Sequence, residues 1–302
     1  GSVAGVLAHL AEVKGKAREH IERDREQLLL SLELVTIDRD MRLDPGFAEL
    51  PPYEPDAQRV AEFFRRMGFI SLLKKVETKV ARDEARDYRT VRTHAELEAL
   101  IATLRAAGAF ALDTETTSLF ALEAELVGMS FSCAASRAWY VPFNCDPPVV
   151  EGGKPALLEA LRPLLCDAGL VRIGQNHKYD ALVLRANGLL TPPVAFDTMV
   201  ASFTIAGSTR RHNLDDLALT YFGITKIPTS ELIGKGAKQI TMAEVPIAKV
   251  AEYACEDAEV TWRVHETLKP RLVADGLVSV YETIERRMPQ VAADMERAGV
   301  LV

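Results

Sequence analysis

The spacing of apolar residues changes along this 302-residue chain and predicts a helical first part followed by an α/β part. In the first part apolar residues recur every three to four positions, as in helices that bury one face. Helices are predicted at 2–13, capped by Ser2, at 16–34, and from Asp56 onwards. Asp44-Pro45-Gly46 and Pro51-Pro52 predict a loop before the third helix.

From Thr93 the pattern predicts a helix to about Ala107 and then short apolar runs of strand length. The predicted strands are Phe110–Asp113, Leu126–Cys133, Ala138–Phe143 and Leu170–Gly174. Further helices are predicted at 155–165, from His177, from Asn213 with Asp216 as its capping-box partner, at 247–269 and at 278–297. Three strands followed by alternating helix and strand predict an α/β fold with a mixed sheet and flanking helices, preceded by a small all-helical segment.

Composition narrows the class of protein. Hydrophobic residues make up 48% and charged residues 26%, which is typical of a soluble globular chain. No apolar run approaches the roughly 18 residues that cross a bilayer, and the N-terminal sequence has no signal-peptide pattern. The four cysteines have no Cys-x-x-Cys spacing, which argues against a cysteine zinc site and favours a reducing cytosol. The first residue is not methionine, so we expect either a fragment of a longer protein or residues added by cloning at Gly1-Ser2, and in both cases a cytoplasmic protein.

Net charge argues mildly against a nucleic-acid binder. The formal charge is −7 at pH 7, whereas such proteins usually carry an excess of basic residues. The argument weakens if the acids bind metal and the bases cluster locally.

The most informative motif is Asp113-Thr114-Glu115, which ends the first predicted strand. Because a strand alternates its faces, Asp113 and Glu115 project from the same side. Two carboxylates held this close raise each other's pKa unless a cation lies between them, and Mg²⁺ or Mn²⁺ suits their hard oxygen ligands. Alone, such a pair is more often a solvated strand end or a cap for the next turn.

Two further acids follow where an α/β fold could bring them to the same strand end. Asp180 lies in the first turn of the helix after Leu170–Gly174, and Tyr253 and Asp257 share one face of the 247–269 helix. Singly, Asp180 is explained by the helix dipole, and the other two by a half-buried hydroxyl and a surface acid. Together, three aspartates and a glutamate can form a two-metal site that acts on a phosphoryl group, with the tyrosine orienting water.

These residues resemble a known superfamily. Asp113-Thr-Glu115, Asn176-x-x-x-Asp180 and Tyr253-x-x-x-Asp257 are similar to the three motifs of the DEDD exonucleases, tyrosine subtype. Within it, the chain resembles the proofreading domain of the bacterial DNA polymerase I family, A-family polymerases. That resemblance rests on six stretches: Asp113–Leu119, Gly174–Asp180, Phe196–Met199, Arg211–Asn213, Gly234-Lys-Gly236 and Tyr253–Asp257.

The resemblance implies a ribonuclease-H-like fold and four parts. Residues 1–76 would be the helical tail of a 5′-nuclease-like region, 77–92 a charged linker, 93–275 the 3′→5′ exonuclease domain, and 276–302 the truncated start of a polymerase domain. The likeness outside the exonuclease domain rests on Leu29–Asp40, Phe63–Leu73 and Ile284–Val302.

The resemblance also implies roles for single residues. Asp113, Glu115 and Asp257 would bind the tighter of two divalent ions, Mg²⁺ or Mn²⁺ with Zn²⁺ as an alternative there. Asp113 would bridge to a second ion held by Asp180, largely through water. Tyr253 and Glu115 would orient the nucleophilic water.

Other residues would bind the nucleic acid. The implied contacts to the terminal nucleotides are Gln175, Asn176, Tyr179 and Arg211, with Leu119 as a wedge against the last base. Local positive potential would come from Lys178, Arg210, Lys226, Lys235 and Lys238. Two positions depart from the pattern: Thr229 stands where some relatives have a base-stacking aromatic, and Asn213 where some have an acid. Neither is an expected metal ligand, although loss of stacking, worth about 1–3 kcal/mol per base, could weaken the grip on single strands.

We therefore predict a monomeric 3′→5′ DNA exonuclease that acts on single-stranded or frayed 3′ ends, alongside the missing polymerase domain of the same chain and without a membrane partner. This fragment should neither extend primers nor cut flaps. One alternative is a ribonuclease-D-like trimmer of RNA 3′ ends, which would not explain Gly234-Lys-Gly236 or the flanking segments. The other is a catalytically inert, nucleic-acid-binding scaffold domain, against which all four acids and the tyrosine argue.

Overall fold

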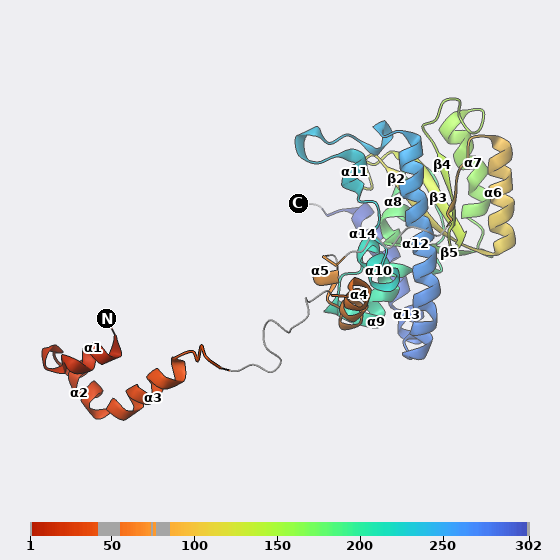
Figure 1. Cartoon of the computed structure of the whole chain (residues 1–302). Helices are drawn as coiled ribbons and strands as arrows, with labels where there is room; N and C mark the ends of the chain where they lie inside the picture. Colours follow the sequence, from red (N-terminus) through yellow and green to blue (C-terminus); the bar gives the residue numbers. More distant parts are fainter. Residues whose placement is uncertain (1, 42–54, 74, 77–84, 301–302) are drawn as a thin grey trace. The chain divides into compact units, whose positions relative to one another are not determined.

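The computed structural model describes residues 2–41, 55–73, 75–76 and 85–300. It consists of two compact units, Gly1–Pro55 and Asp56–Val302 (Figure 1). The predicted loop at 44–46 and 51–52 lies outside the described residues, as does 77–84 of the predicted linker. Among the described residues, no helix combines the length and apolar character needed to cross a membrane.

The first unit is helical, as predicted. Its elements are α1 (Val3–Ala8), the short 3-10 helix η1 (Leu10–Glu12), α2 (Lys16–Arg23) and α3 (Arg25–Val35). Ser2 caps α1, since its hydroxyl accepts a hydrogen bond from the backbone N–H of Gly5 at 3.1 Å. The single helix predicted at 16–34 is wrong in one respect, because Asp24 ends α2 and α3 begins after it. Aspartate is a poor residue for a helix interior, and here its carboxylate pairs with Arg23.

The second unit holds the sheet and the remaining helices. Its elements in chain order are α4 (Ala57–Met67), α5 (Ile70–Leu73), β1 (Asp87–Thr90), α6 (His94–Ala107), β2 (Ala109–Thr116), β3 (Leu126–Ala134), β4 (Arg137–Pro142), α7 (Gly153–Leu165), β5 (Val171–Gly174), α8 (His177–Ala186), β6 (Phe196–Asp197), α9 (Thr198–Ala206), η3 (Gly207–Thr209), α10 (Leu214–Phe222), α11 (Thr229–Ile233), η4 (Gly236–Lys238), η5 (Met242–Glu244), α12 (Ile247–Ala274), α13 (Val278–Thr283), η6 (Glu285–Arg287) and α14 (Met288–Ala298).

The sheet is mixed, which confirms the predicted α/β class. Its six described strands lie in the order β1-β4-β3-β2-β5-β6. The pairs β2–β3 and β3–β4 are antiparallel, as expected for consecutive strands, while β1–β4, β2–β5 and β5–β6 are parallel. The helix predicted from Thr93 is also present, with Thr93 and Glu96 forming a capping box.

The sequence prediction missed two short strands at the sheet edges, β1 and β6. The predicted linker 77–92 is wrong at its end, because Asp87–Thr90 pairs with Arg137–Tyr140 of β4. A four-residue edge strand with one aromatic, Tyr88, has too few apolar residues to give a strand signal. The strand forms because β4 supplies its hydrogen-bond partners.

The two faces of the sheet bury different helices (Figure 1). On one face, leucines of α6 and α7 pack against Phe110 and Leu112 of β2 and Phe131 of β3. On the other face, α12 crosses β1 to β5, and its apolar residues pack against Ala111 of β2 and Tyr140 of β4. The alternation along β2 therefore directs Asp113 and Glu115 toward α12 and Thr114 away from it.

The second unit extends past the predicted domain limits on both sides. Before residue 76, α4 is capped by Asp56, whose carboxylate accepts hydrogen bonds from Gln58 and Arg59, and α5 contacts α10. After residue 275, α14 packs on α8, and the buried hydroxyl of Tyr281 accepts a hydrogen bond from the backbone N–H of Asp197 at 2.8 Å. Both flanks therefore help to position the helices around the sheet.

Gly128 of β3 offers a test of how tightly the sheet is packed beneath α12. A Cβ at this position would lie 2.1 Å from the hydroxyl oxygen of Tyr140 and 2.3 Å from the nearest carbon of its ring. We expect Gly128→Ala to lower the free energy of unfolding by about 1–3 kcal/mol, because a buried ring must move. Gly169→Ala is the matched control: its Cβ would meet only the side chain of Asp167, at 3.2 Å. Urea denaturation measures both, and equal effects would contradict the packing argument.

Candidate functional site

Strand β2 carries Asp113 and Glu115 on the face of the sheet that α12 covers. Ala111, two residues earlier, packs in the apolar cluster that includes α12 residues, and the alternation of the strand places both acids on the same side. Their cross-strand partners on β3 are small: Ser130 lies opposite Asp113, and Gly128 lies opposite Glu115. The space above Gly128 is taken by the ring of Tyr140, which therefore lies beside Glu115 beneath α12.

The surroundings of these two acids oppose their ionisation. Burial raises the pKa of Asp113 well above its usual value, and the charges of Asp180 and Asp257 raise it further. Burial likewise raises the pKa of Glu115, to which the charge of Asp113 adds. The Oε1 atom of Glu115 is buried and has no hydrogen-bond partner among the residues that the structure describes. Four acids therefore crowd a poorly solvated region that a cation would relieve.

Asp180 joins the group from the first turn of α8. Its Oδ1 accepts two hydrogen bonds from Thr114, one from the backbone N–H at 3.1 Å and one from the hydroxyl at 2.6 Å. Its Oδ2 lies 3.6 Å from Nδ1 of His177, which precedes it on the same helix. Asp180 is buried. The middle residue of Asp113-Thr114-Glu115 thus fixes the position of the third acid.

The start of α8 is held by Asp197, a buried carboxylate at the end of β6. Its oxygens accept hydrogen bonds from the backbone N–H groups of Asn176, at 3.2 Å, and His177, at 2.8 Å. Asn176 has the left-handed conformation, with φ 56° and ψ 42°, which asparagine tolerates better than most residues. Burial raises the pKa of Asp197, although these hydrogen bonds oppose the rise. Asp197 thereby orients the turn that carries Asp180.

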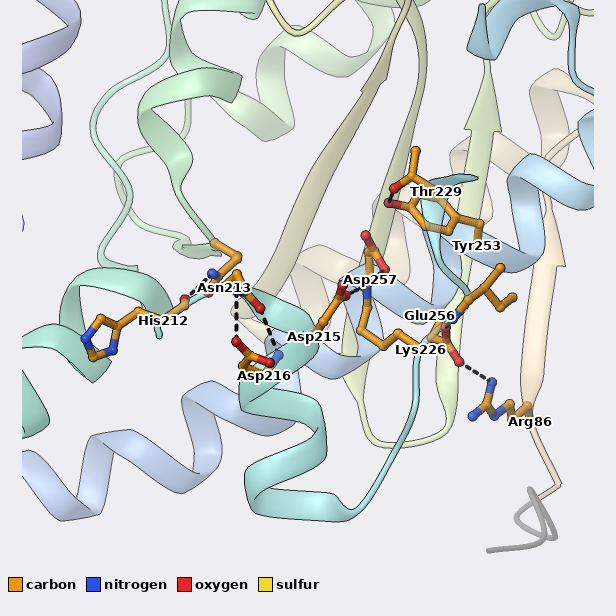
Figure 2. Close-up of polar contacts among 12 residues, drawn as sticks. Arg86, His212, Asn213, Asp215, Asp216, Lys226, Thr229, Tyr253, Glu256 and Asp257 are labelled. Carbon is orange, nitrogen blue, oxygen red and sulfur yellow. Dashed lines mark hydrogen bonds and ion pairs between the residues drawn. The ribbon is translucent and has the colours of Figure 1, made fainter. Parts of the chain in front are cut away.

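Asp257 reaches the group from α12 and is paired with a lysine (Figure 2). Nζ of Lys226 lies 2.5 Å from Oδ1 of Asp257 and 3.1 Å from Oδ1 of Asp215. The Lys226 side chain is only 3% exposed. Burial raises the pKa of Asp257 to about 6, while Lys226 opposes the rise. Burial alone would lower the pKa of Lys226, but the two carboxylates outweigh it and raise the pKa, so the amine remains a cation.

Tyr253 lies one turn before Asp257 on α12, as their spacing predicts. Its hydroxyl is hydrogen-bonded to the hydroxyl of Thr229 at 2.8 Å, and Nζ of Lys226 lies 5.4 Å from its ring centroid (Figure 2). Burial raises the pKa of Tyr253, and the charges of Asp257 and Glu115 raise it further. Tyr253 therefore stays protonated at neutral pH beside the acids.

The acids fit a divalent ion chemically, but protein groups hold two of them in this structure. Among the described residues Oε1 of Glu115 has no hydrogen-bond partner, and burial together with the charges of the neighbouring acids raises the pKa of Asp113 and of Glu115. Within the described part of the chain, no three His, Cys, Asp or Glu side chains are arranged to hold one ion together. Asp180 is instead turned to Thr114, and Asp257 to Lys226.

The predicted nucleic-acid contacts differ in how accessible they are. Leu119, in the loop after β2, is 93% exposed, and Asn176 and Arg211 are also exposed. The amide of Gln175 donates a hydrogen bond to the carbonyl of His212 at 2.9 Å. The hydroxyl of Tyr179 is hydrogen-bonded to Thr116 and to the carbonyl of Ser118, which ties α8 to the loop that presents Leu119.

The five basic residues predicted to supply positive potential differ in their surroundings. Lys235 and Lys238, around the Gly234-Lys-Gly236 loop, are exposed. Lys178 is ion-paired with Glu296 of α14, and Arg210 donates hydrogen bonds to Ser202 and Tyr221. Lys226 is buried between Asp257 and Asp215, whose negative charges offset its own. A lysine in a loop is usually solvated, and no sequence signal marks this one as buried.

Several residues that build the site were given no role from sequence. Thr114 and Asp197 position Asp180, and Glu256, beside Asp257, is fully buried. The carboxylate of Glu256 accepts hydrogen bonds from Arg86 at 3.1 Å and from the backbone N–H of Ile227 at 2.7 Å (Figure 2). Charged side chains are seldom fully buried, and no sequence signal marks Glu256 as buried.

Asn213 begins α10, as predicted, but the capping is only partly the predicted box. Its side-chain oxygen accepts a hydrogen bond from the backbone N–H of Asp216 at 2.8 Å. Its amide nitrogen donates to the carboxylate of Asp216 at 3.1 Å, where a capping box would use the cap's backbone (Figure 2). The cap sets the first turn of α10, which carries Asp215.

The chain is similar to known proteins in sequence and in fold. Residues 88–273 match a protein family described as 3′-5′ exonuclease. The chain is 36% identical over 298 residues to DNA polymerase I of Pseudomonas aeruginosa, a match that covers 93% of this chain and 33% of that protein. The chain thus spans about a third of the length of this relative.

Solved structures show the same fold. The polymerase domain of Pol1 from M. smegmatis, in complex with DNA primer-template and dNTP, aligns with a TM-score of 0.56 at 19% identity, covering 71% of this chain and 32% of that one. Escherichia coli RNase D, an exoribonuclease involved in structured RNA processing, aligns with a TM-score of 0.53 at 19% identity, covering 71% and 52%. At these identities the likeness concerns the fold alone.

The crowding of the acids predicts a pH-dependent cost in stability. Between the usual pKa of glutamate and the raised pKa of Glu115, the folded chain binds more protons than the unfolded chain, so stability falls as pH rises through that range. In chelator at pH 8, we expect Glu115→Gln to raise the free energy of unfolding by about 1–3 kcal/mol, and the gain to shrink toward pH 4. Denaturant titrations across this pH range measure it. Glu252→Gln, an exposed acid of α12, should have little effect at any pH.

Proposed function

Because the chain belongs to the 3′-5′ exonuclease family of DNA polymerase I, we propose that it hydrolyses the 3′-terminal phosphodiester of DNA with the acids of this site. The exonuclease class follows from the family. The observation that carries the proposal for the site is the convergence of Asp113, Glu115, Asp180 and Asp257, whose charges act on one another although they come from three elements.

The four acids are proposed to hold two divalent ions, Mg²⁺ or Mn²⁺, with Zn²⁺ as an alternative at the tighter site. Asp113, Glu115 and Asp257 would hold the tighter ion, and Asp113 with Asp180 the other. When bound, such ions activate a water and stabilise the charge on the leaving oxygen. The partnerless Oε1 of Glu115 supports this assignment, as does the hard-oxygen character of the whole set.

Tyr253 is proposed to orient the attacking water together with Glu115. Its hydroxyl is anchored by Thr229, and its raised pKa keeps the proton in place. It can therefore donate one hydrogen bond and accept another without ionising. In-line attack at the terminal phosphorus would release a nucleoside 5′-monophosphate and leave a new 3′-hydroxyl.

The exposed residues around the acids are proposed to bind the strand. Leu119 would wedge against the last base, and Arg211, Asn176, Gln175 and Tyr179 would contact the terminal nucleotides. Exposed Lys235 and Lys238 would attract the phosphate backbone, which offsets the net negative charge of the chain locally. The accessibility of Leu119 and Arg211 supports their part most directly.

The whole protein is proposed to be a monomeric cytoplasmic DNA polymerase that proofreads with this domain. In that protein, 1–76 would end a 5′-nuclease-like region, 77–92 would include the linker up to β1, 93–275 would be the exonuclease domain and 276–302 would open the polymerase domain. Single-stranded or frayed 3′ ends would be the substrate. The 36% identity to a DNA polymerase I across 93% of this chain, flanks included, supports this proposal.

A nuclease assay on labelled DNA tests the proposal. With Mg²⁺ or Mn²⁺ we expect release of monophosphates from single-stranded 3′ ends. Asp113→Ala should lower the rate at least about 100-fold, the scale seen when one group that stabilises transition-state charge is removed. Glu252→Gln should retain the wild-type rate. Chelation should abolish the activity of the wild-type chain.

Three results would contradict the proposal. Equal rates for wild type and Asp113→Ala would identify a contaminating nuclease and favour the inert scaffold. Preference for RNA over DNA 3′ ends of the same sequence would favour the ribonuclease-D-like alternative. Undiminished activity in chelator would exclude the metal-dependent chemistry.

A further inference from the structure

Lys226 is in direct contact with one acid of the site, and its position is unusual for a lysine. It lies between α10 and α11, its side chain is 3% exposed, and its Nζ is 2.5 Å from Oδ1 of Asp257. A buried ammonium group requires strong compensation, because its transfer from water is costly. Here the compensation comes from Asp257 and from Asp215 at 3.1 Å (Figure 2).

The two carboxylates that hold Lys226 differ in their surroundings. The Asp257 side chain is 11% exposed and faces the other acids, whereas the Asp215 side chain is 64% exposed on the first turn of α10. Lys226 therefore connects an inner carboxylate, proposed as a metal ligand, to an outer one that has no part in the proposed metal set. The ammonium group of Lys226 can leave Asp257 and stay in contact with Asp215.

The backbone around Lys226 is fixed to the helix that carries Asp257. The N–H of Ile227, the next residue, donates a hydrogen bond to Oε2 of Glu256 at 2.7 Å, and Arg86 holds the other oxygen of Glu256. Glu256, which precedes Asp257 on α12, thus fixes the backbone next to Lys226. Only the four side-chain methylenes of Lys226 need to move for the ammonium group to leave Asp257.

We propose that Lys226 is a resident cation of the site, which stabilises the acids in the metal-free chain and must leave Asp257 for Asp215 when a divalent ion binds. This inference rests on the proposed function, because it takes Asp257 as a metal ligand. An ammonium group and a divalent ion repel each other strongly at one carboxylate oxygen. Lys226 thus lowers metal affinity, and Asp215 limits that loss by receiving the ammonium group.

Metal binding to the chelator-treated chain, without nucleic acid, tests the proposal. Titration calorimetry with Mn²⁺ should show about tenfold tighter binding in Lys226→Met than in wild type, within the range of coupling energies between contacting groups. Asp215→Asn should weaken Mn²⁺ binding about three- to tenfold, since the ammonium group then has only Asp257. Lys249→Met, an exposed lysine of α12, controls for the loss of one charge and should match wild type.

Thermal unfolding supplies a second readout. In chelator, Lys226→Met should unfold at a lower temperature than wild type, because the buried acids lose their cation, and saturating Mn²⁺ should raise its midpoint by more than it raises that of wild type. If Lys226→Met does not fold in chelator, refolding upon addition of Mn²⁺ alone is the expected result, and Lys226→Gln serves for calorimetry.

The opposite directions expected for the two variants separate this proposal from a structural role. Equal or weaker Mn²⁺ binding in Lys226→Met would overturn it, because Lys226 would then help the acids to bind metal or only support the fold. Unchanged or tighter binding in Asp215→Asn would also overturn it. A wild-type chain that binds no Mn²⁺ and releases no monophosphate would instead contradict the proposed function.

Discussion

Repulsion between carboxylates that share a poorly solvated space is the constraint on which the rest of this structure depends. Asp113 and Glu115 cannot separate, because one strand holds both on the same face, and Asp180 and Asp257 add their charges from two helices. In water such charges would be screened, but between a sheet and a helix they raise each other's pKa. The fold must therefore either supply positive charge here or lose stability.

Three of the four acids differ in the partners that the chain gives them. Asp180 receives two hydrogen bonds from Thr114, Asp257 receives the ammonium group of Lys226, and Glu115 keeps one oxygen without a partner. Behind them, Asp197 and Glu256 use their own buried carboxylates to fix the start of α8 and the loop after α10. Hydrogen bonds thus fix the residues around the four acids, whereas the negative charge of the acids is only partly balanced. A bound metal ion would supply the missing positive charge.

The sequence could predict the parts of this site that follow from local periodicity. Period two put Asp113 and Glu115 on one face, and helical spacing put Tyr253 near Asp257, because neither depends on the rest of the fold. The short edge strand β1 was not predicted, because it lies in a charged stretch without a strand pattern and its hydrogen bonds come from β4. The burial of Lys226 and the role of Thr114 arise only when α8, α10 and α12 are assembled, so no local pattern could reveal them.

Under the proposed function, a chain of net charge −7 binds an anionic substrate, and the difference between its inner and outer charges makes this possible. Glu115, Asp180 and Asp257 are buried and Asp113 is partly buried, so their field is not that of a solvated acidic surface. Of the basic residues discussed above, Arg211, Lys235 and Lys238 are exposed, while Lys178, Arg210 and Lys226 are engaged within the protein. A divalent ion at the centre would reverse the sign of the local field toward the scissile phosphate. The same ions would then relieve the instability of the fold and attract the substrate, which couples folding, metal binding and nucleic-acid binding through one set of carboxylates.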